Sequence, residues 1–70
     1  MPNKLQYLYL KKIIDVIRSC ETFDQLENTQ QWFNKVTLIN NLPARYADKI
    51  MKAYRGKKQQ IQNGLAAKYN

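Results

Sequence analysis

The chain has 70 residues and a formal net charge of +7, with one cysteine and no histidine. A length of this order accommodates a single domain, here expected to span residues 1–70. The lone Cys20 excludes an intramolecular disulfide and favours a reducing compartment. Apolar runs fall short of the about 20 residues that span a bilayer, and the start of the chain lacks the pattern of a signal peptide. We therefore expect a cytoplasmic protein.

Most of the positive charge lies in the last third of the chain. Residues 1–44 carry five basic and four acidic side chains, whereas residues 45–70 carry seven basic side chains and one acidic one. This asymmetry predicts an anionic partner, which could be nucleic acid, an acidic protein surface or an anionic membrane. A solvated face that only keeps the protein soluble is the alternative. So small a core without a disulfide also favours a homodimer or a stabilising partner.

A first helix is predicted over about residues 4–20, with Asn3 as its N-cap. One face carries the apolar side chains expected in the core: Leu5, Tyr9, Ile13, Val16, Ile17 and Cys20. The opposite face carries charges at spacings that allow ion pairs between helical neighbours: Lys4, Lys11, Asp15 and Arg18. Three apolar residues fall outside the core face and suggest a second contact surface: Tyr7, Leu8 and Ile14.

Thr22, followed three residues later by Gln25, forms the pattern of a capping box at the start of a second helix. This helix is predicted over about residues 23–39 and should pack against the first as an antiparallel hairpin, because the turn is short. Its buried stripe is expected to hold five residues: Leu26, Thr29, Trp32, Phe33 and Val36.

Asn40-Asn41-Leu42-Pro43 is the second break, with Pro43 suited to the first position of a third helix. The ordered helix is predicted to run to about Arg55, because Gly56 weakens a helix by about 1 kcal/mol relative to alanine. Residues 57–70 form a basic tail, expected to continue the helix or to be partly disordered. Ile61, Leu65 and Lys68 keep the helical phase, which favours continuation.

These segments predict an all-α protein, a small three-helix bundle made of a helical hairpin and a basic third helix. Its packed part should cover about residues 4–55. The side chains expected at its centre are Ile13, Val16, Ile17, Leu26, Phe33, Val36, Ala47, Ile50 and Tyr54.

Patterns that indicate catalysis are not found in the sequence. The five carboxylates are dispersed, the two glycines make no phosphate-binding loop, and no histidine supplies a general base or metal ligand. Cys20 falls on the core face of its helix and is interpreted as a structural thiol. We therefore expect no enzyme, no cofactor and no metal site.

The third helix carries the functional prediction. Arg45, Lys49 and Lys52 share the face opposite its apolar stripe, and Arg55 extends the row by one turn, over about 15 Å. Lys57 and Lys58 could lengthen the row, and Tyr46 at its border could stack on a base. The second helix is too long for a typical helix-turn-helix, so contacts to nucleic acid should be mostly to phosphate.

A family resemblance covers residues 18–27. Their sequence, Arg-Ser-Cys-Glu-Thr-Phe-Asp-Gln-Leu-Glu, resembles the Arg-x-Cys-x-Thr-x-Asp-x-Leu-Glu segment of the small Hha/YmoA nucleoid modulators. The resemblance implies an all-helical protein that binds the nucleoid-structuring protein H-NS and helps to silence genes, with Asp48 as a contact residue. Residues 43–58 differ, because they are strongly basic where that family is more acidic.

Two hypotheses follow from these patterns. The first is a non-enzymatic, regulatory protein that binds nucleic acid or a nucleoprotein complex. The second is a protein-interaction module of phage or plasmid type, an inhibitor or adaptor, whose basic helix docks on an acidic protein surface. Peripheral membrane binding is weaker, because an interfacial helix needs bulky apolar residues opposite its cations and this helix places them in the core.

Overall fold

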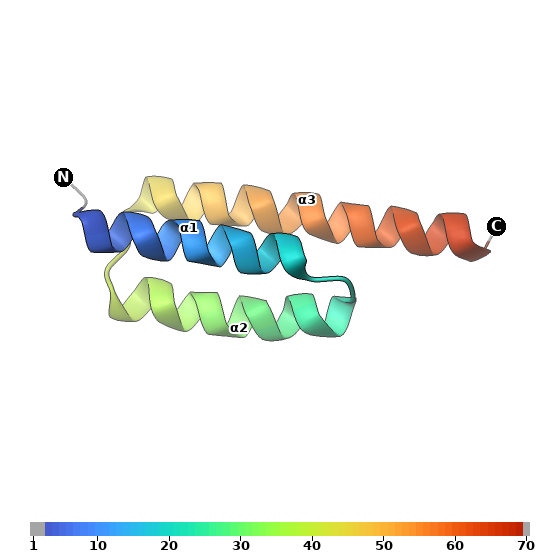
Figure 1. Cartoon of the computed structure of the whole chain (residues 1–70), viewed down its shortest axis with the longest axis horizontal. Helices are drawn as coiled ribbons and strands as arrows, with labels where there is room; N and C mark the ends of the chain where they lie inside the picture. Colours follow the sequence, from blue (N-terminus) through green and yellow to red (C-terminus); the bar gives the residue numbers. More distant parts are fainter. Residues whose placement is uncertain (1–2, 70) are drawn as a thin grey trace.

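The computed structural model describes the backbone of residues 3–69 and the side chains of residues 3–64, and these residues form three helices (Figure 1). Helix α1 spans Lys4–Ser19, α2 spans Phe23–Ile39 and α3 spans Ala44–Tyr69. Helices α1 and α3 run in the same direction, and α2 runs antiparallel to both (Figure 1). The predicted fold class, a small all-α three-helix bundle, is confirmed.

Both predicted N-caps are present. At the start of α1, Asn3 Oδ1 accepts from the Gln6 backbone N–H at 2.8 Å, and Gln6 Oε1 accepts from the Asn3 backbone N–H at 3.1 Å. At the start of α2, Thr22 Oγ1 accepts from the Gln25 backbone N–H at 3.2 Å. The reciprocal bond of this second box is shifted by one residue, because Gln25 Oε1 accepts from Glu21 at 2.8 Å.

The turn between α2 and α3 follows the predicted break. Asn41 has a φ of 51°, in the left-handed region that asparagine tolerates better than most residues. Pro43 is predicted at the first position of α3, but it lies one residue before the helix begins. Its carbonyl accepts from the N–H groups of Tyr46 and Ala47 at 2.9 and 3.2 Å. Leu42, within the turn, is buried and closes this end of the core.

The hydrophobic core lies between the three helices. Five of its predicted residues are almost completely buried: Ile13, Ile17, Leu26, Phe33 and Ile50. The other four are half-buried at the margin: Val16, Val36, Ala47 and Tyr54. Tyr54 still joins α3 to α2, because its ring meets Phe33 edge-on at 6.0 Å and its hydroxyl donates to Gln30 Oε1 at 3.2 Å.

The buried face of α1 differs from the prediction. Leu10 is only 4% exposed, whereas Leu5, which was expected in the core, is 58% exposed. Helix α1 packs against both α2 and α3, so its buried stripe is turned toward α3 and includes Leu10. Ile14 packs partly against the core for the same reason and is not part of a second surface. Tyr7 and Leu8 remain exposed.

Helix α3 does not end near Arg55, and the alternative that the basic tail continues the helix is confirmed as far as Tyr69. It continues through Gly56 to Tyr69 and extends beyond the α1–α2 turn (Figure 1). Ile61 packs against the edge of the core, which gives the continuation a tertiary contact. The side chains of Leu65 and Lys68, expected to continue the apolar stripe, lie outside the described residues. Among the residues described, none of the helices is both long enough and apolar enough to cross a membrane.

Candidate nucleic-acid interface

Four cations follow the outer side of α3: Arg45, Lys49, Lys52 and Arg55, here called the basic row. All four side chains are exposed. The opposite side of α3 is held in the core by Ile50, which is only 1% exposed. Packing therefore fixes the rotation of α3 and directs the basic row to solvent, because residues three and four apart share one side of a helix.

The charges of the bundle are not neutralised by one another. In residues 3–64, whose side chains the structure describes, no lysine or arginine nitrogen lies within 4.0 Å of a carboxylate oxygen. The ion pairs expected between Asp15 and its neighbours Lys11 and Arg18 are therefore not formed. Asp48 is the one carboxylate of α3 and is also exposed.

Tyr46 does not have the position that the sequence suggested. It is only 8% exposed and belongs to the core, so it is more buried than Tyr54. The guanidinium carbon of Arg45 lies 5.7 Å from the centre of the Tyr46 ring, at a distance typical of a cation–π contact. The prediction that Tyr46 could stack on a base is wrong, because the core and Arg45 already cover its ring.

The two lysines after Gly56 separate in the structure. Lys58 is exposed. Lys57 is half-buried and lines an open groove where α3 passes the α1–α2 turn. Its position one turn before Ile61 places it on the inner side of α3. The expectation that Lys57 lengthens the basic row is therefore wrong.

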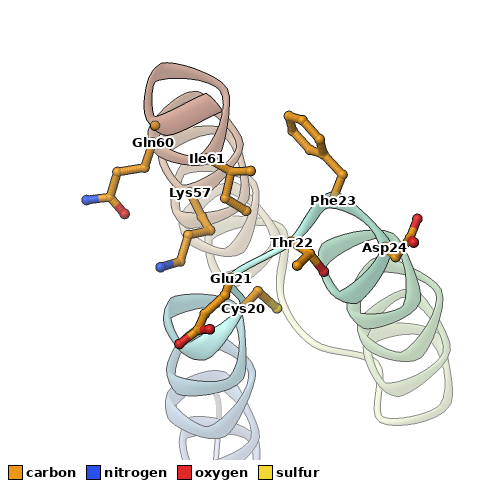
Figure 2. A pocket seen from close by; sticks show the side chains of 9 residues that line it. Cys20, Glu21, Thr22, Phe23, Asp24, Lys57, Gln60 and Ile61 are labelled. Atoms are coloured by element: carbon orange, nitrogen blue, oxygen red, sulfur yellow. The ribbon is translucent and has the colours of Figure 1, made fainter. Parts of the chain in front are cut away.

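This groove has a volume of about 650 Å³ and is closed on one side by α3 and on the other by residues 20–24 (Figure 2). Phe23 at the start of α2 and Ile61 of α3 lie on opposite sides of it (Figure 2). Phe23 is 39% exposed and contributes an apolar side chain to the groove. The sequence carries no signal of this groove, because Phe23 is interpreted there only as a residue of the first helical turn. The groove depends on α3 continuing past Arg55, which is one of the alternatives that the sequence leaves open for residues 57–70.

The side chains offer little for covalent chemistry. Cys20 is buried and free, as predicted. Its Sγ lies 3.4 Å from the Val16 carbonyl oxygen, to which it donates, and 3.3 Å from Thr29 Oγ1, where either atom can donate. The thiol thus joins α1 to α2. In the described part of the chain, no group of three or more His, Cys, Asp or Glu side chains is arranged to hold a metal ion.

Comparison with known proteins adds no assignment to these features. No protein-family model, no curated protein and no solved structure matches the chain. The resemblance of residues 18–27 to the Hha/YmoA modulators therefore stays an expectation. In the structure these residues form the end of α1, the first turn and the start of α2.

Proposed function

We propose that this protein is a non-enzymatic, regulatory nucleic-acid-binding protein that contacts the phosphate backbone through the basic row of α3. One observation carries the proposal. Four cations are exposed along one side of a helix whose other side is anchored in the core. A rigid helix presents these charges without first having to order the backbone, which lowers the entropic penalty of binding.

The expected mode of binding is electrostatic. The basic row covers about 15 Å along α3, and a duplex carries one negative charge per about 1.7 Å of its axis. Lysine and arginine side chains that contact phosphates release condensed counterions, so affinity should fall steeply with salt. Contacts to phosphate position a protein on the duplex but do not read the base sequence. We therefore expect weak discrimination between duplexes of different sequence.

The test is a salt series of duplex binding with the parent protein and the variant Lys49→Ala/Lys52→Ala. If the basic row makes four phosphate contacts, the slope of log affinity against log salt is at least about 3.6 in magnitude. Removing two contacts should lower that magnitude by about 1.8. The loss of affinity should be similar for unrelated duplex sequences, and anisotropy of a labelled duplex measures both quantities.

The matched control is Lys12→Ala/Lys35→Ala. Both lysines are exposed, and they lie on α1 and α2, so the control removes the same charge away from α3. It should leave the slope close to that of the parent. If the parent fails to bind duplex in low salt, or the control weakens binding as much as the α3 variant, the proposal is wrong. Docking on an acidic protein surface would then be the better account of the same cations.

A further inference from the structure

A second row of cations lies on α1. Lys4, Lys11 and Arg18 are exposed and follow one another at intervals of seven residues. Seven residues are close to two helical turns, so the three side chains leave the same side of α1. Asp15 also leaves this side, between Lys11 and Arg18, and is the one carboxylate among them.

The contacts of α1 show which way this side faces. Cys20 marks the side toward α2, because its Sγ lies 3.3 Å from Thr29 Oγ1. Ile14 packs against the core from a position about 120° round the helix, which places it on the side toward α3. Lys11 and Arg18 lie one turn before and one turn after Ile14. They therefore border the α1–α3 contact from its solvent side.

The same reasoning places part of the basic row beside them. Tyr54 marks the side of α3 toward α2, because its ring meets Phe33. Tyr46 is buried about 80° round the helix, on the side toward α1. Lys49 follows Tyr46 by one turn, and the Arg45 guanidinium lies 5.7 Å from the Tyr46 ring centre. Both cations therefore border the α1–α3 contact from solvent, as Lys11 and Arg18 do.

The two rows also lie at the same level of the bundle. Near the start of α1, Gln6 Nε2 donates to the carbonyl oxygens of Asn40 and Asn41, just before α3 begins. At the other end, Cys20 and Glu21 share a groove with Lys57 (Figure 2). Because α1 and α3 run in the same direction between these two points (Figure 1), the cations of both helices lie along the same stretch of the contact.

From this juxtaposition we propose that α1 and α3 together present a two-helix basic face that binds the phosphates of duplex nucleic acid. Its six cations are Lys4, Lys11, Arg18, Arg45, Lys49 and Lys52. This inference rests on the proposed function and enlarges its site, because half of the cations come from a helix that the basic row does not include. Arg55 lies at the outer edge of the face.

The geometry suits a duplex. Packed helices lie about 8–10 Å apart, and the major groove is about 12 Å wide, so two cation rows match the spacing of the phosphates on either side of one groove. The α1 row extends over about 21 Å, along which a duplex carries about twelve charges. An interfacial helix buries a continuous apolar side in a membrane, whereas here Leu8 and Tyr7 are the exposed apolar side chains near the α1 cations.

One aromatic side chain belongs to this face. Tyr7 is 50% exposed and lies seven residues before Ile14, so it leaves α1 on the side of the α1–α3 contact. Its phenol can donate a hydrogen bond to a phosphate oxygen. Tyr7 therefore has the accessible position that sequence reasoning gave to Tyr46.

The inference is tested with Lys11→Ala/Arg18→Ala in the duplex-binding salt series. Six contacts predict a parent slope of about −5.4, and a loss of about a thousandfold in affinity between about 50 and 200 mM salt. The α1 variant should lower the magnitude of the slope by about 1.8, as the Lys49→Ala/Lys52→Ala variant does. Asp15→Asn should strengthen binding at low salt, because it removes the carboxylate from the face. Lys12→Ala/Lys35→Ala is the control of equal charge.

The outcomes separate the two proposals. If the α3 variant weakens binding and the α1 variant behaves as the control does, the two-helix face is wrong and the basic row stands alone. If neither variant differs from the control, both proposals are wrong. An unchanged affinity of Asp15→Asn would also contradict the two-helix face. Melting curves of each variant establish that the bundle is folded, which is expected because all the altered side chains are exposed.

Discussion

At the scale of single residues, Gln6 has two structural roles. Its Oε1 accepts from the Asn3 backbone N–H at 3.1 Å and completes the cap of α1. Its Nε2 donates to the carbonyl oxygens of Asn40 and Asn41 at 3.2 and 3.1 Å, across 34 and 35 residues of chain. The amide thus links the start of α1 to the turn between α2 and α3, and one side chain holds the two segments together.

The variant Gln6→Glu separates these roles. A carboxylate still accepts from the Asn3 N–H and suits the first turn of a helix. It cannot donate, and it faces two carbonyl oxygens that lose their partner. We expect the free energy of unfolding to fall by about 0.5–1.5 kcal/mol, measured by denaturant titration at neutral pH. Equal stability of Gln6→Glu and the parent would show that the link to the turn contributes nothing.

The tyrosines show where residue-level reasoning fails. A helical wheel placed Tyr54 in the core and Tyr46 at its border, and the structure reverses their order of burial. A wheel gives the phase of an apolar stripe, but not the directions of the two neighbouring helices that it must face. Tyr46 is buried in the bundle, and its burial depends on how the three helices dock.

At the scale of elements, the sequence predicts the ends of helices where a capping side chain marks them. The bounds of α2, Phe23–Ile39, agree with the prediction because Thr22 starts the helix and Asn40-Asn41 ends it. The extent of α3 was not predictable in the same way. Gly56 is unfavourable in a helix taken alone, whereas the helical phase of Ile61 favours continuation, so the sequence leaves both alternatives open. The contact of Ile61 with the core stabilises the continuous helix.

Gly56 gives a prediction for α3. A Cβ added at this position meets no atom within 4 Å, and the backbone is helical. Gly56→Ala should therefore stabilise the bundle by about 1 kcal/mol, which corresponds to a rise in melting temperature of about 4–8 °C for a domain of this size. Circular dichroism melts measure the change. A lower melting temperature would indicate that α3 ends at Gly56 in solution.

Gly64→Ala is the matched substitution beyond Ile61. No atom lies within 4 Å of a Cβ at this position either. Gly64 lies nearer to the end of α3 than Gly56 does, and residues near the end of a helix contribute less to the cooperative unfolding of a domain. We expect Gly64→Ala to raise the helical signal while changing the melting temperature less than Gly56→Ala does. The difference between the two variants reports how far the cooperative unit of α3 extends.

At the scale of the whole molecule, the surface combines repulsive charge with exposed apolar side chains. The net charge is +7. Among the described side chains, six large apolar ones are at least 39% exposed: Leu5, Tyr7, Leu8, Phe23, Leu38 and Ile39. Leu38 and Ile39, each 80% exposed, lie at the end of α2. The bonds from Gln6 to the following turn bring this end close to the start of α1, where Leu5 is also exposed.

This combination predicts self-association that strengthens with salt. At low ionic strength the like charges of two copies repel each other, and added salt screens that repulsion while apolar contact is retained. Sedimentation at low and high salt should show a shift toward dimer as salt rises, and the melting temperature should increase with protein concentration. The variant Leu38→Gln/Ile39→Gln should remain monomeric, because it removes the two most exposed apolar side chains. It should still fold, since both side chains lie outside the core.

Duplex binding should change in the opposite direction, because phosphate contacts weaken as salt rises. The two effects can therefore be measured on one protein without being confused. Lys49→Ala/Lys52→Ala should weaken duplex binding and favour the dimer, since it lowers the net charge. A parent protein that is monomeric at every accessible concentration and salt, with a melting temperature independent of concentration, would contradict self-association. It would leave the basic face as the only proposed contact surface.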